Sequence, residues 1–254
     1  MRAMYRWPVA VFSSGTAVLI AACTASLGEL PPGASSDGSP DIGTPLCPAQ
    51  DDSGVLTAFR VDGTITVDGA LTESTWARTR TVDFSNAVRS DNKVGVRVAW
   101  DDENLYLAFS VIDDKLESDP NSRVFQDDGA ELYLDTMHNA TPQMDGDDYH
   151  FIVNIVDDIQ IGNVDVAHGT LPVRTMAIIG GYAMEFAIPW SMTGGRPQAG
   201  QTMGMLLGNN DRDNGSSKQF DWVGVIDNGT GDYARPNLWG DLRLTDILAD
   251  GSCL

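Results

Sequence analysis

The chain has 254 residues and a formal net charge of −20, from 36 acidic and 16 basic side chains. Only three of the basic residues are lysine, so unassisted binding to nucleic acid or to an anionic membrane surface is not expected. Hydrophobic residues make up 42% of the chain, which is enough for a core and argues against global disorder. Thirty of the acids are Asp and six are Glu, a ratio that favours turns and strands over helices.

The first 22 residues are predicted to be a lipoprotein signal peptide. Arg2 and Arg6 provide a basic start, and the uncharged stretch 7–20 is shorter than the roughly 20 residues that a membrane-spanning helix needs. Residues 19–23, Leu-Ile-Ala-Ala-Cys, resemble the lipobox of bacterial lipoproteins, in which the cysteine is acylated and becomes the N-terminus. Cys23 is therefore expected to anchor the protein to the bacterial cell envelope, at the outer membrane if the source is Gram-negative. Contact with the membrane is expected only through this anchor.

Residues 23–50 are predicted to be a flexible tether. They contain four Gly, five Pro and four Ser with almost no apolar periodicity, and such a segment buries too little surface to order itself. The folded part is assigned to residues 51–254. Cys47 and Cys253 lie near its two ends, and in an oxidising compartment we expect a disulfide between them; the alternative is two free thiols.

The folded part has the pattern of many short β-strands. Alternating apolar residues from Val94 to Trp100, an acidic turn and a second run from Leu105 to Ile112 predict a hairpin with one buried face. Further strands are predicted at 56–67, 130–135, 149–156, 173–179, 182–188, 202–209, 219–225 and 241–244, whereas only Thr72–Arg78 has a helical pattern. The prediction is an all-β protein, an antiparallel β-sandwich of the jelly-roll type with one short helix.

Two further expectations concern single residues in this pattern. Trp76, Trp100 and Trp190 occur within apolar stretches and are expected to pack between the two sheets. Glu185 lies within a predicted strand and is expected to face outward.

Several motifs follow one another in a recognisable order. They are Val67-Asp68-Gly69-Ala70 with Trp76, residues 98–107 with Asp113, residues 125–135, residues 182–190, Met203-Gly204, and residues 239–244. In this order the set resembles the family 9 carbohydrate-binding modules, β-sandwiches that are often attached to xylanases and other glycan-degrading enzymes. The resemblance covers roughly residues 60–246 and implies the fold more strongly than the ligand, because the same fold hosts domains without a sugar.

The resemblance also implies two aromatic positions of a sugar site. In sugar-binding members of the family, two rings enclose the terminal sugar and bury the C–H face of the pyranose. By the spacing within the family motifs, these positions fall on Phe125, three residues before Asp128, and on Tyr233, six residues before Trp239. Both are aromatic, but the family has tryptophan at each, so weaker stacking is expected.

The polar positions of the implied site are partly kept and partly replaced. Glu131 matches a family glutamate that accepts hydrogen bonds from sugar hydroxyls, and Asn154 matches a polar position on a neighbouring strand. The family arginine falls on Ile152 and a family glutamine falls on Gly208. The loss of two hydrogen-bonding side chains is expected to alter sugar specificity.

Acidic turns predict calcium. Asp145, Asp147 and Asp148 present carboxylates in one loop, members of the resembled family carry structural calcium, and this loop falls in a comparable place. The alternative is a solvated turn. A second acidic stretch, residues 211–215, begins like an EF-hand loop but has Trp222 at the twelfth position, where an EF-hand has glutamate.

No catalytic motif of a hydrolase, metalloprotease or phosphate-binding loop is present, and the acids do not single out a catalytic pair. The prediction is a non-catalytic, lipid-anchored protein that binds a polysaccharide or its chain end for a partner glycoside hydrolase. The negative charge favours a neutral glycan. Two alternatives are a structural or protein-interaction sandwich that has lost the sugar, and an electron-transfer sandwich that binds haem b through Met and Lys.

Overall fold

The computed structural model describes residues 55–61, 63–162, 164–223 and 232–248. The predicted signal peptide and tether, the lipidation site Cys23 and the proposed disulfide partners Cys47 and Cys253 lie outside the described residues. Within the described ranges, no helix has the length and apolar character needed to cross a membrane.

The described chain is built almost entirely of strands. These are β1 (Val55–Arg60), β2 (Val82–Ser85), β3 (Lys93–Trp100), β4 (Asn104–Ile112), β5 (Gly129–Asp135), β6 (Asp148–Asn154), β7 (Ile159–Ile161), β8 (Val164–Val166), β9 (Val173–Ile178), β10 (Gly181–Pro189), β11 (Thr202–Asp213), β12 (Ser216–Asp221) and β13 (Gly240–Leu248). The helical elements are α1 (Ser74–Arg78) and the 3-10 turns η1 (Val124–Gln126), η2 (Trp190–Met192), η3 (Asp232–Ala234) and η4 (Pro236–Leu238). The prediction of an all-β fold with one short α-helix is confirmed, but β2, β7 and β8 were not predicted.

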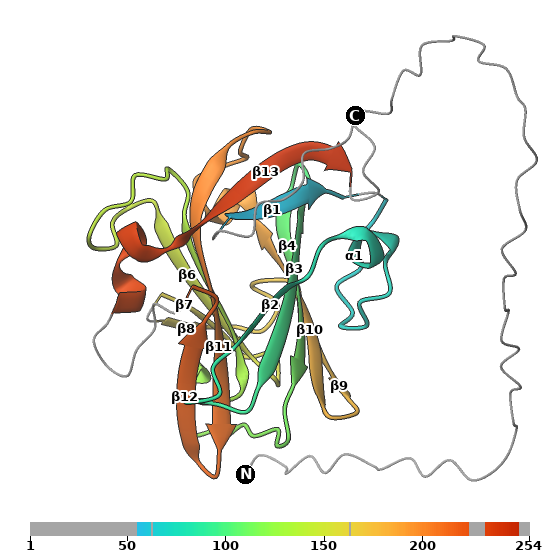
Figure 1. The fold of residues 1–254 in the computed structure, drawn as a ribbon, viewed down its shortest axis with the longest axis vertical. Coiled ribbons are helices and arrows are strands. Elements are labelled where there is room, and N and C mark those ends of the chain that lie inside the picture. Colours follow the sequence, from blue (N-terminus) through green and yellow to red (C-terminus); the bar gives the residue numbers. More distant parts are fainter. Residues whose placement is uncertain (1–54, 62, 163, 224–231, 249–254) are drawn as a thin grey trace, which may run out of the picture. The chain divides into compact units, whose positions relative to one another are not determined.

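The strands form one curled sheet whose order is β8-β7-β6-β5-β11-β13-β1-β3-β4-β10-β9, with β12 beside β11 and β2 beside β3. In Figure 1 the curl produces two layers, one with β6, β11 and β12 and the other with β3, β4 and β10, while β1 and β13 cross above them. The strand β1 pairs in parallel with both β13 and β3. The prediction of an antiparallel sandwich therefore holds for most of the sheet but not at β1, where the two layers are joined.

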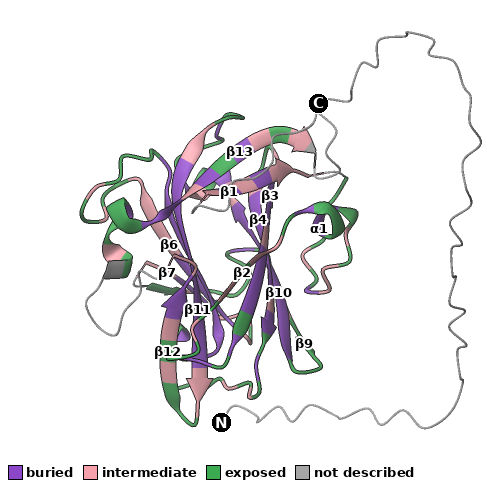
Figure 2. Cartoon of the chain, in the orientation of Figure 1, coloured by how far each residue is buried: buried purple, intermediate pink, exposed green. Residues whose placement is uncertain are grey.

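The core lies between the layers, as strand alternation requires. Val96 and Val98 of β3 point inward and are fully buried, opposite Phe109 and Leu107 of β4. Leu132 of β5 reaches the same cluster from the other layer. Complete burial of such a side chain stabilises the fold by about 1.5–3 kcal/mol, and Figure 2 shows buried positions along the strands of both layers.

A second cluster covers part of the outer face of the sheet. Trp100 and Trp190 lie in the main core as predicted, whereas Trp76 packs in this second cluster with Ile65 and Tyr106. A strand was predicted over residues 56–67, but β1 ends at Arg60. The residues after Arg60 do not continue the strand and pack against this outer face.

Glu185 was predicted to face outward, and the structure shows that it is buried, with 1% of its surface exposed. The segment containing Asp68, Gly69 and Trp76 covers it. Its Oε2 accepts the backbone N–H groups of Asp68 and Gly69 at 2.9 and 2.8 Å, and its Oε1 accepts the Trp76 indole N–H at 2.6 Å. Burial raises the pKa of Glu185, and these three hydrogen bonds counteract the rise.

Candidate functional site

The predicted sugar-binding residues lie on the outer face of the layer that contains β5, β6, β11 and β12. Because side chains alternate along a strand, Leu132 enters the core and Glu131 faces the other way. Glu131 lies opposite Ile152 of β6 on one side and opposite Gly208 of β11 on the other. The two positions at which the sequence departs from the family pattern are therefore the immediate neighbours of Glu131.

Glu131 is the centre of a buried hydrogen-bond network. Its Oε2 accepts the Tyr133 hydroxyl at 2.6 Å and lies 2.9 Å from Nε2 of His150, while its Oε1 accepts the Asn210 amide at 2.7 Å. Burial by itself raises the pKa of Glu131, but hydrogen bonds and the charge of His150 outweigh it, so that the pKa is below its ordinary value. An ionised carboxylate, held in one orientation, therefore underlies this face at neutral pH.

Aromatic rings surround this network. The Tyr133 and His150 rings stack with their centroids 3.8 Å apart and an interplanar angle of 13°. Tyr133 also contacts Tyr233, at 5.9 Å between centroids, and Trp239, at 5.6 Å. The Trp239 indole N–H donates to the Tyr233 carbonyl at 3.0 Å, which fixes the loop that carries Tyr233. The structure thus brings Tyr233 next to the Glu131 network.

Phe125 lies on η1, just before the start of β5. The residue is 38% exposed, as is Tyr233, and the Arg123 guanidinium lies 5.5 Å from the Phe125 ring centroid. The Ser217 hydroxyl donates to the Phe125 carbonyl at 3.4 Å, which ties η1 to the start of β12. Phe125 thus lies just before β5, and Tyr233 contacts Tyr133 of β5, two residues after Glu131.

The Asn154 side chain forms hydrogen bonds only with nearby protein groups among the described residues. Its amide donates to Asp127 Oδ2 at 2.9 Å, and its carbonyl oxygen accepts the backbone N–H groups of Val156 and Asp158 at 3.2 and 2.8 Å. The side chain is 1% exposed. These bonds hold the turn after β6 against the end of η1. The Asn154 side chain, which was predicted to bind the ligand, therefore already has protein partners for its amide and its carbonyl oxygen.

Three members of the network were not predicted: Tyr133, His150 and Asn210. Each lies two residues from a position that the sequence analysis singled out, Glu131, Ile152 and Gly208 respectively. Since strand side chains alternate with a period of two, the same faces were already implied. The period of two could therefore have identified these residues.

The acidic loop contributes two of the three predicted carboxylates to a cluster. Asp147 and Asp148 lie with Asp135 of β5 so that one oxygen of each is within 4.8 Å of the others. Asp145 is not in this trio, but its backbone N–H donates to Asp148 Oδ2 at 2.7 Å. Asp147 Oδ2 and Asp148 Oδ1 are buried without a hydrogen-bond partner among the described residues. Burial and the neighbouring Asp145 raise the pKa of Asp147 to about 6.

A deeper cluster was not predicted. Asp113, Asp128 and Asp211 bring one oxygen each within 4.8 Å of one another and are at most 4% exposed. Asp211, which the sequence analysis placed in a turn, lies on β11. Burial raises the pKa of Asp128 to about 8 and that of Asp113 to about 6, and repulsion between the carboxylates adds to both. Asp113 Oδ2 and Asp211 Oδ1 have no hydrogen-bond partner among the described residues.

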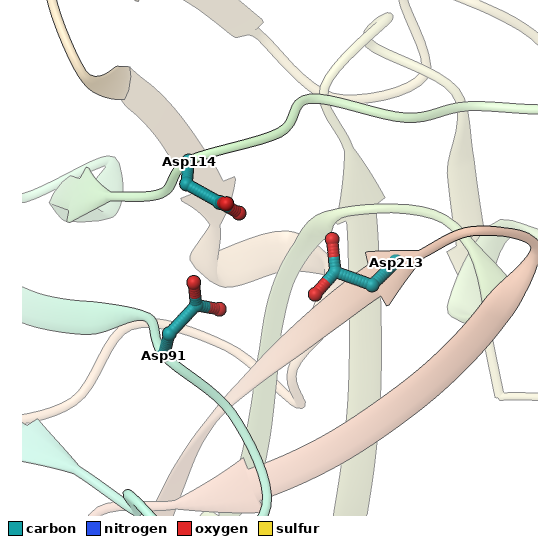
Figure 3. Close-up of side chains that lie close together, drawn as sticks. All are labelled: Asp91, Asp114 and Asp213. Atoms are coloured by element: carbon teal, nitrogen blue, oxygen red, sulfur yellow. The ribbon is translucent and has the colours of Figure 1, made fainter.

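A third acidic group lies at the surface beside the deep cluster. Figure 3 shows Asp91, Asp114 and Asp213 directed toward one another from three separate segments. Asp91 and Asp114 are exposed, and repulsion from Asp91 raises the pKa of Asp114. Since its carboxylates can be solvated, this group by itself does not indicate a bound ion.

Curated relatives match this chain over its strand-rich part. The endo-1,4-beta-xylanase A of Thermotoga neapolitana is 28% identical over 198 residues, which are 75% of this chain and 18% of the xylanase. The endo-1,4-beta-xylanase A of Thermoanaerobacterium saccharolyticum is 26% identical over 190 residues, 74% of this chain and 16% of that enzyme. The chain thus spans less than a fifth of the length of these relatives.

Solved structures share the fold. A family 9 carbohydrate-binding module from Caldicellulosiruptor kristjanssonii in complex with cellotriose has a TM-score of 0.63 and 22% identity, over 75% of this chain and 94% of that chain. A putative carbohydrate-binding protein from Bacteroides uniformis has a TM-score of 0.53 and 16% identity, over 75% of this chain and 98% of that chain.

The family model described as "Carbohydrate family 9 binding domain-like" matches residues 61–247. This range contains every motif on which the predicted resemblance depends and most of the described strands. The resemblance is confirmed, and the chain belongs to the carbohydrate family 9 binding domain-like family.

Proposed function

We propose that this chain is a non-catalytic carbohydrate-binding module that holds a glycan over Glu131, between the Phe125 and Tyr233 rings. The family match over residues 61–247 carries the proposal. The geometry supports it, because a charged acceptor network flanked by half-exposed aromatic rings suits a polyol with apolar C–H faces. With Glu131 saturated by protein donors, His150 and Tyr133 are the groups of the network that we expect nearest the ligand.

The proposed ligand is a neutral β-1,4-linked glucan or xylan, or its chain end. A charge of −20 disfavours anionic glycans at low ionic strength. A similar solved structure holds cellotriose, and the similar full-length relatives are xylanases. Phenylalanine and tyrosine in place of the tryptophans of the family make weaker binding the expectation.

In this proposal the protein captures polysaccharide and a partner glycoside hydrolase cleaves it. Both oxygens of Glu131 accept hydrogen bonds from protein groups, so a role as nucleophile or proton donor is not proposed for it. The acyl group expected on Cys23 would hold the module at the bacterial cell envelope, at the outer membrane in a Gram-negative source.

We further propose that calcium occupies the deep cluster Asp113, Asp128 and Asp211 and the loop cluster Asp135, Asp147 and Asp148. Carboxylates that converge within 4.8 Å, with orphaned buried oxygens, are costly without a cation. Calcium accepts six to eight oxygen ligands, and its charge would offset both the burial of these carboxylates and the repulsion between them. Its role would be structural, because these aspartates lie in or beside β4, β5, β6 and β11.

A glycan array, run with calcium and with a chelator, tests the proposed function. The wild-type protein should bind neutral β-1,4 glycans. Phe125→Ala and Tyr233→Ala should each bind at least about tenfold more weakly, because each removes one stacking contact and the area that it buries. Absence of binding to every glycan by a folded wild-type protein would refute the proposal. It would instead favour a structural or protein-interaction module, which the apolar Ile152 and Gly208 beside Glu131 would then explain.

A further inference from the structure

A second concave surface lies where β12 approaches β2. The Phe84 and Phe220 rings meet edge to face at 5.7 Å, and Arg89 donates to the Gln219 carbonyl at 2.6 Å, which closes the curled sheet at this point. Outside this closure is an open groove of about 960 Å³, formed by β2, β3, β4 and residues 221–223. Ligand sites commonly measure about 300–1,000 Å³, so the groove can hold several sugar rings.

The most informative residue in the groove is Arg97 of β3. It is half-buried, its Nε is buried without a partner, and no hydrogen bond or ion pair joins its guanidinium to any described residue. Other arginines of this acidic chain are paired: Arg60 with Asp102, Arg174 with Asp157, and Arg212 with Glu117 and Asp119. The N–H groups on the two terminal nitrogens of this partly desolvated guanidinium are the donors that an oxygen-rich ligand in the groove would satisfy.

Gly95, two residues before Arg97, lets neighbouring side chains approach β3 closely. A Cβ at Gly95 would lie 2.9 Å from Thr81 Cγ2 and 3.0 Å from Asp83 Oδ1, so these side chains occupy the space above the glycine. Gly95 and Arg97 face the same side of β3, since they are two residues apart. The Thr81 methyl group and the Asp83 carboxylate therefore lie over Gly95, and Thr81, Asp83, Gly95 and Arg97 all line the groove.

The charges in the groove indicate the class of ligand. Arg97 and Lys93 are opposed by Asp83 and Asp221, so the groove offers donors and acceptors in equal measure. An anion would meet two carboxylates, whereas a neutral polyol can use both kinds of group. Trp222 is half-buried against the main core and also lines the groove, where its indole can supply an apolar surface for a pyranose.

The groove has no lining residue in common with the Glu131 network, but it reaches β12, which is two strands from β5 in the sheet. Glu131 lies opposite Gly208, and Gly208 lies opposite Asp221 at the edge of the groove. At about 4.8 Å per strand, Asp221 is about 10 Å from Glu131. One extended glycan chain could therefore reach both surfaces.

We propose that this groove is a second glycan-binding surface, in which Arg97, Asp83 and Trp222 bind a neutral polysaccharide chain. The proposal rests on the proposed function and extends it: the affinity for a glycan would depend on the length of the glycan chain. The Glu131 site would bind a short sugar alone, and the groove would add affinity only for longer oligosaccharides.

Nuclear magnetic resonance titration of the full chain tests the groove separately from the first site. The Arg97 Nε–H and the Trp222 indole N–H report on the groove, and the Trp239 indole N–H, bonded to the Tyr233 carbonyl, reports on the Glu131 site. The probes are cellobiose, cellohexaose and xylohexaose. We expect the hexasaccharides to shift both sets of resonances and to bind about tenfold more tightly than cellobiose, as one charged hydrogen bond and one stacking contact allow.

Arg97→Met should remove the gain with chain length and the Trp222 shift while leaving the Trp239 shift intact. Arg243→Met is the matched control, because Arg243 is an exposed arginine on β13 outside the groove. A shift of Trp239 alone with every probe would overturn the groove and leave the proposed function standing. Shifts of Trp222 and Arg97 alone would support the groove and overturn the Glu131 site, and the absence of all shifts would overturn both. Tighter groove binding of oligogalacturonate than of the neutral chains would overturn the neutral class of ligand.

Discussion

The deep acidic cluster allows a quantitative test on the isolated protein. Without a cation, burial raises the pKa of Asp113 from 3.8 to about 6. At 1.36 kcal/mol per unit, an ionised Asp113 lowers the free energy of unfolding by up to about 3 kcal/mol at neutral pH. The folded state binds the extra proton between pH 4 and 6. The stability of the calcium-free protein should therefore fall as the pH rises through that window, and calcium should restore it at pH 7.5.

Asp113→Asn removes this charge and keeps the shape of the side chain. The asparagine oxygen can still accept the Lys115 backbone N–H, which now donates to Asp113 Oδ1 at 2.7 Å. Its amide can donate to the carboxylates of Asp128 and Asp211. In chelator the variant should be more stable than wild type at pH 7.5, by about 1–3 kcal/mol, and it should gain less stability on addition of calcium.

Urea unfolding monitored by tryptophan fluorescence, at pH 5 and pH 7.5 with EGTA or calcium, measures both effects. Asp165→Asn on the exposed β8 is the control, because it lies outside every acidic cluster and should follow the wild type. Equal stability of the calcium-free wild type at the two pH values would refute the reasoning. A full calcium response in Asp113→Asn would refute the assignment of calcium to this cluster.

Four further predictions concern other parts of the chain. Glu131→Gln keeps one acceptor oxygen but places an amide N–H₂ group against the protein donors that now bond to the carboxylate. We expect at least about tenfold weaker glycan binding in calorimetry and a loss of about 1–3 kcal/mol in the free energy of unfolding. Unchanged glycan affinity would contradict a role for the charge. Phe125→Trp enlarges a half-exposed ring and should tighten cellohexaose binding, whereas equal or weaker binding would count against Phe125 as a stacking residue. Glu185→Gln should destabilise the fold by about 1–3 kcal/mol without changing glycan affinity, because it opposes three donors; a thermal melt equal to wild type would contradict this. Cys23→Ala should shift the protein from the membrane fraction to the soluble fraction, and retention at the membrane would exclude the acyl anchor.

The strand pattern was predictable where it is local. The hairpin of β3 and β4 follows from apolar residues at every second position and an acidic turn between them, both of which lie within twenty residues. The order of motifs from Val67 to Leu244 identified the family, because each motif is a strand end or turn with its own residue requirements. β7 and β8 escaped prediction because three residues are too few for an alternation to be visible.

The burial of Glu131 and Glu185, in contrast, was not predicted from the sequence. Both are glutamates within strands, and both are buried. What buries Glu185 is a segment more than a hundred residues earlier in the chain, and no property of the local sequence reveals that contact. The N–H groups that donate to Glu185 were therefore identified only from the folded structure.

By itself, the sequence determined the all-β class, the family and the face of β5 on which Glu131 lies, because strand periodicity and motif spacing are local properties. The acidic character seen first in the composition became specific only in three dimensions. Asp113 follows β4, Asp128 precedes β5 and Asp211 lies within β11. Only the order β5-β11 and the curl that brings β4 near them place these three carboxylates in one buried cluster. The same closure, between β12 and β2, decided that Arg97 lines a groove rather than a flat sheet. Such contacts depend on which strands become neighbours, and strand neighbours are set by packing of the whole core.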